Sequence, residues 1–142
     1  MKISAKIEYA CLAMLELAAR YDAGEPVRNG QIAAAHDIPS RFLVQILLQL
    51  KSAGLVVSIR GAAGGYRLAR RPEEVTLGEV MSVIGGPNLT LTIDAEDDSA
   101  AAKVLCETWS NIHEVQQEML DSTTLADLAE RAKGYAEHMY YI

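Results

Sequence analysis

A short run that combines arginines with glycines, residues 58–68, is the part of the chain best suited to bind an anion. Arg60 and Arg67 stand near its two ends, and glycine between them allows positive φ and close approach of the backbone to another surface. Apolar residues on both sides predict two short strands joined by a turn. The pattern indicates contact with a phosphate backbone, and the candidate residues are Arg60, Gly61, Gly64, Gly65, Tyr66 and Arg67.

Two predicted helices precede this hairpin and would position it. Residues 29–36 predict a short helix with Asn29 as its N-cap, followed by a tight connection through residues 37–39. A second helix is expected from Ser40, its cap, to Gly54. Apolar residues recur in it at the spacing that buries one helical face: Leu43, Ile46, Leu47, Leu50 and Ala53. Two helices joined by a tight turn and followed by a glycine-tipped hairpin are typical of a winged helix-turn-helix.

In that fold the second helix enters the major groove of DNA, and the hairpin, called the wing, lies against the flanking minor groove or backbone. The candidate contacts from the helix are Ser40, Arg41, Val44 and Gln45. On the wing side, Arg67, Arg70 and Arg71 are phosphate candidates. An N-terminal helix over about residues 4–21 adds Lys2, Ser4 and Lys6 at its first turn. Its expected inward face is Ile7, Ala10, Cys11, Met14, Leu15 and Ala18.

A series of short segments over residues 1 to about 84 matches the pattern of a known family. These segments, in order, are Ile3–Lys6, Tyr9–Ala10, Ile32–Ala33, Ile38–Pro39, Phe42–Leu43, Gln45–Leu47, Leu50–Lys51, Ala53–Val56, Ser58, Arg60–Gly61, Gly64–Tyr66, Leu68–Ala69 and Thr76–Val80. Through them the chain resembles the bacterial regulators typified by the iron-sulfur cluster regulator, the nitrite-sensing repressor and the cysteine metabolism repressor, and the resemblance continues more thinly at residues 124–128. It implies a mainly α fold with a small β wing, and a dimeric repressor that binds double-stranded DNA at a pseudo-palindromic operator.

The charge of the chain divides between its two halves. Residues 1–72 carry ten Lys and Arg against five Asp and Glu, whereas residues 73–142 carry three against fourteen, which together give the net charge of −6. Because screening acts over about 8 Å at physiological ionic strength, a distant acidic half weakens DNA binding without preventing it. The net positive charge is confined to residues 1–72, which contain the proposed helix-turn-helix and wing and are called the reading head below.

Several classes of protein are excluded by composition and motifs. A chain of 142 residues has room for one core and for no second catalytic domain. The three histidines, His36, His113 and His138, are scattered, and the glycine run matches no nucleotide-binding fingerprint, so an enzyme is not expected. Without an apolar run that could cross a bilayer or a signal-peptide core, we expect a cytoplasmic protein with no membrane partner.

The region after the wing is expected to join the reading head to a partner copy. Thr76 with Glu79 predicts a capped helix over residues 77–84, which would complete a DNA-binding domain of residues 1–84. Residues 85–98 form a loop in which 88–93 alternate like a strand, and the acidic stretch 94–98 lacks the spacing of a calcium loop.

A helical dimerisation region is then expected over residues 99–142. A long helix from Ser99 to about Asp121 carries an apolar stripe close to a 3.5-residue repeat. The resemblance implies that this helix crosses its counterpart in a homodimer, and the expected interface residues are Leu105, Trp109, Ile112 and Met119.

Cysteine content argues against the iron-sulfur cluster of some relatives. A cluster needs several thiolate or imidazole donors, yet of the cysteines found in that region of cluster-bearing relatives only Cys106 is present, and Trp109 replaces a histidine. A second branch uses a glutamate and a histidine of the first helix, where this chain has Glu8 but Leu12. We therefore expect no cofactor and no metal site.

Two alternatives stay open at this point. Cys106 is interpreted first as an ordinary buried thiol, and the alternative is a redox- or cluster-responsive residue. The winged helix could also serve as a docking module for a protein partner, and the salt dependence of DNA affinity would separate that function from DNA binding.

Overall fold

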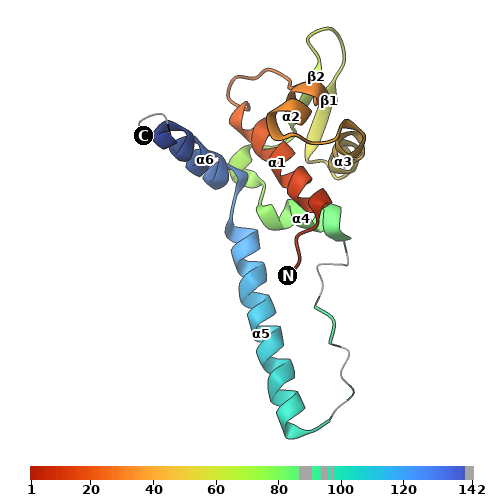
Figure 1. Ribbon diagram of the computed structural model, residues 1–142, viewed down its shortest axis with the longest axis vertical. Helices are drawn as coiled ribbons and strands as arrows, with labels where there is room; N and C mark the ends of the chain where they lie inside the picture. Colours follow the sequence, from red (N-terminus) through yellow and green to blue (C-terminus); the bar gives the residue numbers. More distant parts are fainter. Residues whose placement is uncertain (87–90, 94–95, 97, 140–142) are drawn as a thin grey trace.

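The computed structural model describes residues 1–86, 91–93, 96 and 98–139. It is mainly helical, with one two-stranded antiparallel sheet (Figure 1). This confirms the predicted fold class. The elements, in order, are α1 (Ala5–Ala19), α2 (Asn29–His36), α3 (Ser40–Ser52), β1 (Val56–Ile59), β2 (Gly65–Leu68), the 3-10 helix η1 (Pro72–Glu74), α4 (Leu77–Gly85), α5 (Ala100–Ser122) and α6 (Leu125–Met139).

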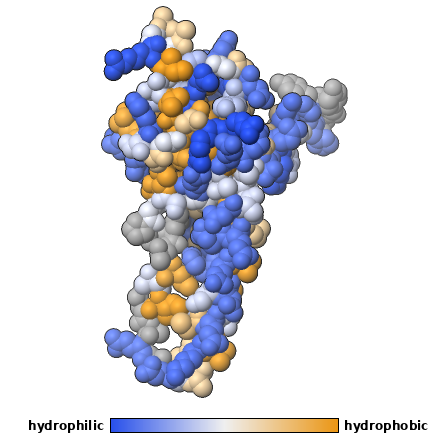
Figure 2. Space-filling model, turned by 180° about the vertical axis from the view of Figure 1, so that it is seen from behind, coloured by the Kyte–Doolittle hydropathy of each residue, from blue (hydrophilic) through white to orange (hydrophobic). Residues whose placement is uncertain are grey.

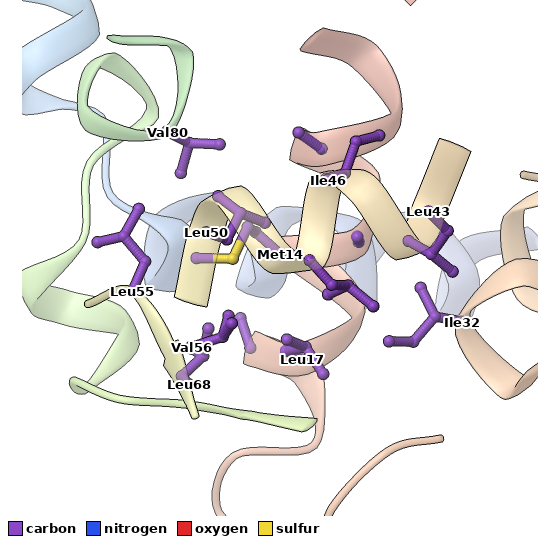
Figure 3. Packing of buried hydrophobic residues seen from close by; sticks show 14 of the residues in the cluster. Met14, Leu17, Ile32, Leu43, Ile46, Leu50, Leu55, Val56, Leu68 and Val80 are labelled. Carbon is purple, nitrogen blue, oxygen red and sulfur yellow. The ribbon is translucent and has the colours of Figure 1, made fainter. Parts of the chain in front are cut away.

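One apolar core holds α1 to α4 and the wing together (Figure 3). The predicted inner face of α3 is buried at Leu43, Ile46, Leu47 and Leu50. Ala53 was expected there and is exposed, because it is the C-cap, where the chain already turns away from the core.

The inner face of α1 differs in part from the expectation. Ala13 and Leu17 are buried, whereas Cys11 and Leu15 are only half-buried. The interior therefore lies against a stripe of α1 that is rotated from the predicted one. Four of the six residues expected on this face are buried, namely Ile7, Ala10, Met14 and Ala18.

The two expected caps within the helix-turn-helix are wrong by one residue. Asn29 is the first residue of α2, and the N-cap is Arg28, whose backbone N–H donates to Gln31 Oε1 at 2.9 Å. Ser40 likewise lies inside α3, whose N-cap is Pro39. The Pro39 carbonyl accepts from the N–H groups of Phe42 and Leu43 at 3.0 and 3.1 Å, so the proline itself begins the helix. Polar residues beside a turn predicted the right place but the wrong cap.

The wing is tied to the head by a backbone pair that the sequence did not indicate. Ile59 pairs with Gly65 and Val57 with Arg67 across the hairpin. In addition, the Val27 N–H donates to the Tyr66 carbonyl at 2.9 Å, and the Tyr66 N–H donates to the Val27 carbonyl at 2.8 Å. The chain just before α2 therefore extends the hairpin by one short bridge and fixes its angle to the helices.

The long helix α5 projects away from the head (Figure 1). It begins at the predicted cap, where Ser99 Oγ accepts from the Ala102 N–H at 3.1 Å. Residues 91–93 do not form the expected strand, and the rest of that prediction, like most of the acidic stretch 94–98, lies outside the described residues.

A short backbone bridge anchors the other end of α5. The Leu77 N–H donates to the Thr123 carbonyl at 2.8 Å, and the Leu125 N–H donates to the Val75 carbonyl at 2.9 Å. Leu125 then enters the core and begins α6, a 15-residue helix within the region 99–142 that was expected to be helical. Within the described part of the chain, no helix has the length and apolar character needed to cross a membrane.

Candidate nucleic-acid interface

The exposed face of α3 forms the centre of the candidate site. Ser40, Arg41, Val44 and Gln45, all predicted from the sequence, are exposed, while the opposite face is buried in the core. With about 100° between successive residues, Arg41, Val44 and Gln45 lie within one arc of the helix surface. The core therefore holds α3 so that these side chains point into solvent, as a helix that reads a groove requires.

Arg41 contacts an aromatic pair, Phe42 and Tyr9, that was not predicted from the sequence. Its guanidinium carbon lies 5.0 Å from the centroid of the Phe42 ring, a cation–π distance. The Phe42 ring in turn lies 6.5 Å from that of Tyr9 in α1. These contacts position the arginine at the start of α3. The apolar Phe42 at an exposed position beside a cation was the available signal.

Two of the wing glycines, Gly64 and Gly65, stand where side chains would not fit. A Cβ at Gly64 would collide with the carbonyl oxygen of Ile59, and one at Gly65 would lie 2.6 Å from the Val27 carbonyl oxygen. Gly61 has φ +111° and faces open space. Gly64 therefore lets the hairpin close tightly, and Gly65 lets it lie against Val27. Arg60 is exposed at the end of the hairpin, and Tyr66 and Arg67 are half-buried along β2. All six predicted wing residues therefore lie in or beside this hairpin.

Cations near these elements differ in whether a carboxylate already holds them. Within the described residues Arg41, Arg60 and Arg67 have no ion pair with a carboxylate. Arg70, in contrast, is paired with Glu79, and Arg71 Nη2 lies 3.5 Å from Glu74 Oε1. Because their charge is offset within the chain, we leave Arg70 and Arg71 out of the proposed interface.

The start of α1 brings a further set of predicted residues to the surface. Lys2 is exposed and Lys6 is half-buried. Ser4 is exposed, but its Oγ accepts from the Ile7 N–H at 3.2 Å and so caps α1. The Ser4 side chain thus has a structural task, while its helix N-terminus still offers backbone N–H groups to a phosphate.

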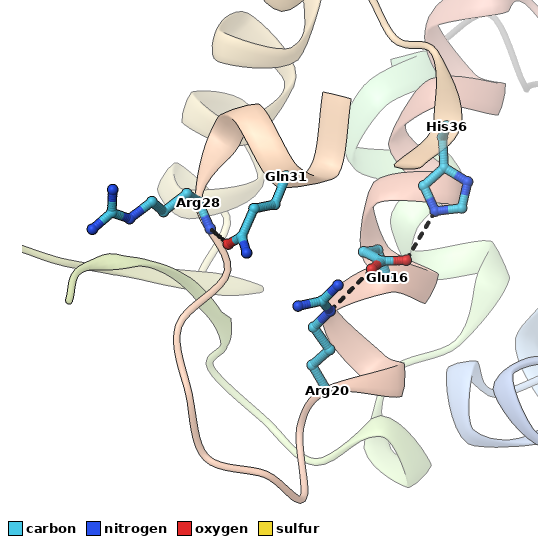
Figure 4. A network of polar contacts seen from close by, with 5 residues as sticks. All are labelled: Glu16, Arg20, Arg28, Gln31 and His36. Atoms are coloured by element: carbon cyan, nitrogen blue, oxygen red, sulfur yellow. Dashed lines mark hydrogen bonds and ion pairs between the residues drawn. The ribbon is translucent and has the colours of Figure 1, made fainter. Parts of the chain in front are cut away.

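A polar network connects α1 to the end of α2 (Figure 4). Glu16 Oε2 lies 3.1 Å from His36 Nε2, and Glu16 Oε1 accepts from Arg20 Nε at 3.0 Å. His36 is the last residue of α2, so this contact fixes the first helix of the helix-turn-helix to the scaffold. From the sequence, His36 was recognisable only as an isolated histidine.

The two cysteines lie in different environments. Burial, with a smaller contribution from the Glu8 carboxylate, raises the pKa of the Cys11 thiol to about 11. Cys106 is exposed on α5 in the single chain, which differs from the expected buried thiol.

These donors do not fit an iron-sulfur cluster. Among the described residues no group of three or more His, Cys, Asp and Glu side chains could hold a metal ion. The chain contains two cysteines, one on α1 and one on α5, whereas a cluster needs several donors held together.

An apolar stripe runs along the projecting helix. Trp109 is 50% exposed and Met119 66%, and no residue of α5 is buried. Leu105 and Ile112 are also exposed, so all four predicted interface residues are open to solvent in the single chain. Figure 2 shows apolar atoms along this lower part of the molecule.

A helix-turn-helix with an exposed second helix and a glycine-closed wing defines a DNA-binding transcription regulator of the winged-helix class. Residues 3–131 match the Rrf2 family, described as iron-dependent transcriptional regulators. The chain is 40% identical to the HTH-type transcriptional regulator CymR of Bacillus subtilis over 143 residues, which cover 100% of both chains.

Solved structures agree with this match. The structure of CymR, the global cysteine regulator of B. subtilis, has a TM-score of 0.82 and 38% identity, and the match covers 92% of this chain and 98% of that one. T. potens IscR has a TM-score of 0.75 and 34% identity, with 93% and 88% covered. The chain belongs to the Rrf2 family of transcriptional regulators. It is a DNA-binding regulator and not an enzyme, as the sequence predicted.

Proposed function

We propose that the protein represses transcription as a homodimer that binds a pseudo-palindromic operator without a resident iron-sulfur cluster. The observation that carries the proposal is the pairing of two exposed surfaces on one chain. One is the polar and cationic face of α3 with the wing, and the other is the apolar stripe of α5.

A second copy of the chain is the occupant that fits the α5 stripe. Its large apolar residues, including Trp109 and Ile112, repeat at close to 3.5-residue spacing, which is the pattern of helices that pair along a seam. Two copies related by a two-fold axis present two α3 helices, and such a protein reads two half-sites about 34 Å apart. The operator symmetry thus follows from the dimer.

Each half-site is contacted by three elements in this proposal. Arg41, Val44 and Gln45 of α3 face the bases, with Ser40 at the start of the same helix. Arg60 and the glycine turn approach the minor groove. Phosphates are bound by Arg67 and by the start of α1 with Lys2, Ser4 and Lys6.

The test measures DNA affinity against salt concentration with purified protein. Phosphate contacts predict a steep negative slope of log affinity against log salt, because counterions are released. A flat slope would reject the function and favour a protein-docking module. Light scattering on the same sample gives the oligomeric state.

Genome-wide footprinting then identifies the operator. Because the B. subtilis relative is a global cysteine regulator, promoters of cysteine-metabolism genes are the first candidates. An absorbance spectrum of anaerobically purified protein tests the cofactor separately, since a bound cluster absorbs visible light and the free polypeptide does not.

A further inference from the structure

The outward face of α3 contains a residue that the proposed interface has not yet used. Leu48 is 53% exposed, more than Val44 at 43%, although it lies in the middle of a helix that buries four aliphatic residues. On a helical wheel, Arg41, Val44, Gln45 and Leu48 fall within an arc of about 100°. Leu48 lies almost directly opposite the centre of the buried stripe.

Val44 and Leu48 are neighbours on that face because they are four residues apart. They form an apolar patch flanked by the polar or cationic side chains of Arg41 and Gln45. Single exposed leucines are common and need no explanation. Two adjacent aliphatic side chains, Val44 and Leu48, at the centre of a surface that faces DNA need an explanation. Both would be dehydrated when the helix enters the groove.

The major groove offers one apolar feature to such a patch, the C5-methyl group of thymine. A leucine gains nothing from a phosphate oxygen and would leave base-edge donors and acceptors without partners. The four-residue step from Val44 to Leu48 advances about 6 Å along the helix axis, and successive bases on a strand are about 3.4 Å apart. The thymine methyl group that lies beside Leu48 is therefore expected one or two base steps from the thymine methyl group that lies beside Val44.

We propose that Leu48 is a second base-reading residue, which contacts the methyl group of a thymine adjacent or next but one to the thymine read by Val44. The inference rests on the proposed placement of α3 in the major groove. It makes each half-site rich in thymine at two defined positions, with Arg41 and Gln45 reading or clamping the positions around them.

The experiment removes one methyl group at a time from the DNA and one side chain at a time from the protein. An operator is first recovered by selection from randomised DNA, and each thymine in a half-site is then replaced by deoxyuridine. The affinities of the wild-type protein, Leu48→Ala and Val44→Ala are measured by fluorescence anisotropy at one salt concentration. We expect the wild-type protein to lose about fourfold at each of two thymines, the effect of exposing about one methylene equivalent.

Each contact is identified by the thymine at which a given protein variant no longer responds to the loss of the methyl group. Leu48→Ala should abolish the response to uracil at one thymine and keep it at the other, and Val44→Ala should show the reverse. A 5-methylcytosine at the position assigned to Leu48 should restore part of the affinity that an unmethylated cytosine loses. Because each comparison is made within one protein, a general loss of affinity cancels.

Two results would overturn the inference without touching the proposed function. Leu48→Ala could retain every methyl response of the wild-type protein, or the recovered operator could lack thymines at this spacing. Either would assign Leu48 to the shallow groove that it borders with Val83 of α4, a surface for another protein. If Leu48→Ala unfolds, Leu48→Gln keeps a long side chain and serves in its place. Failure to recover any operator would instead reject the proposed function.

Discussion

The attachment of the wing to Val27 depends on Gly65, and replacing this glycine with alanine tests that dependence. A Cβ at this position would lie 2.6 Å from the Val27 carbonyl oxygen and 2.7 Å from its carbonyl carbon, with φ at +153°. Real Cβ atoms do not approach so closely, so β2 would have to move away from Val27. That movement breaks the two hydrogen bonds between Val27 and Tyr66, at 2.9 and 2.8 Å.

The expected cost follows from those contacts. Two backbone hydrogen bonds contribute about 1 kcal/mol each, and an unfavourable φ adds about 1–2 kcal/mol. Gly65→Ala should therefore lower the free energy of unfolding by about 3–4 kcal/mol. Gly61→Ala is the matched control, because Gly61 has φ +111° but nothing within 4 Å of its Cβ position. It should cost only the backbone term, about 1–2 kcal/mol.

Urea denaturation followed by circular dichroism measures both variants, and operator affinity is measured under folding conditions. We expect Gly65→Ala to lose stability and also to bind the operator more weakly, since Arg60 and Arg67 would no longer be held in place. Equal losses of stability for Gly61→Ala and Gly65→Ala would show that φ alone matters. The bridge to Val27 would then have no role in fixing the wing.

Four further predictions concern DNA binding, assembly and thiol chemistry. Arg60→Ala should weaken operator binding by about 1–3 kcal/mol in anisotropy titrations, whereas Lys133→Ala, on α6, should leave it unchanged; equal effects would remove the wing from the interface. Trp109→Glu should convert the dimer into a monomer in light scattering and weaken operator binding, since a carboxylate would be buried in an apolar seam; unchanged dimers would refute the α5 interface. Val44→Glu should shift one position per half-site from thymine towards cytosine by about 1–3 kcal/mol, because a carboxylate accepts from cytosine N4; identical motifs from both proteins would place Val44 away from the bases. Cys11, with its pKa raised from 9.0 to about 11, holds about a hundredfold less thiolate at pH 8 and should be alkylated that much more slowly than after unfolding in urea, as peptide mapping would show; equal rates in both states would contradict the burial of this thiol.

The parts of the fold that sequence reasoning predicted are those set by local spacing. Leu43, Ile46 and Leu50 recur at the helical period, and the core buries them because one face of α3 has nowhere else to go. The glycines of the wing were recognisable because tight hairpins need them. Thr76 was identified correctly as a cap, and its Oγ1 accepts from the Glu79 N–H at 3.2 Å.

The parts that were missed depend on residues far apart in sequence or on competition between neighbours. Nothing local in Val27 reveals that it pairs with Tyr66, because the two residues are far apart in the sequence and meet only in the folded chain. Asn29 and Ser40 are good caps by type, yet both helices begin one residue earlier than predicted, so that Arg28 and Pro39 occupy the cap positions. The contact between Glu16 and His36 likewise joins two helices and has no signature within either.

In the proposed dimer, α5 joins the two DNA-binding domains, so its attachment to each domain decides how they are placed. Its C-terminal end is held by two backbone hydrogen bonds, in which the Leu77 N–H donates to the Thr123 carbonyl and the Leu125 N–H donates to the Val75 carbonyl. Gly78 lets the last turn of α5 approach α4 closely, with the Leu120 carbonyl carbon 3.2 Å from where a Cβ would lie. In the proposed dimer, a helix fixed in this way sets the position of the α5 seam relative to α3, which shares the core with α4. On that proposal, the spacing of the two half-sites depends on this junction, whereas base preference depends on the outward face of α3.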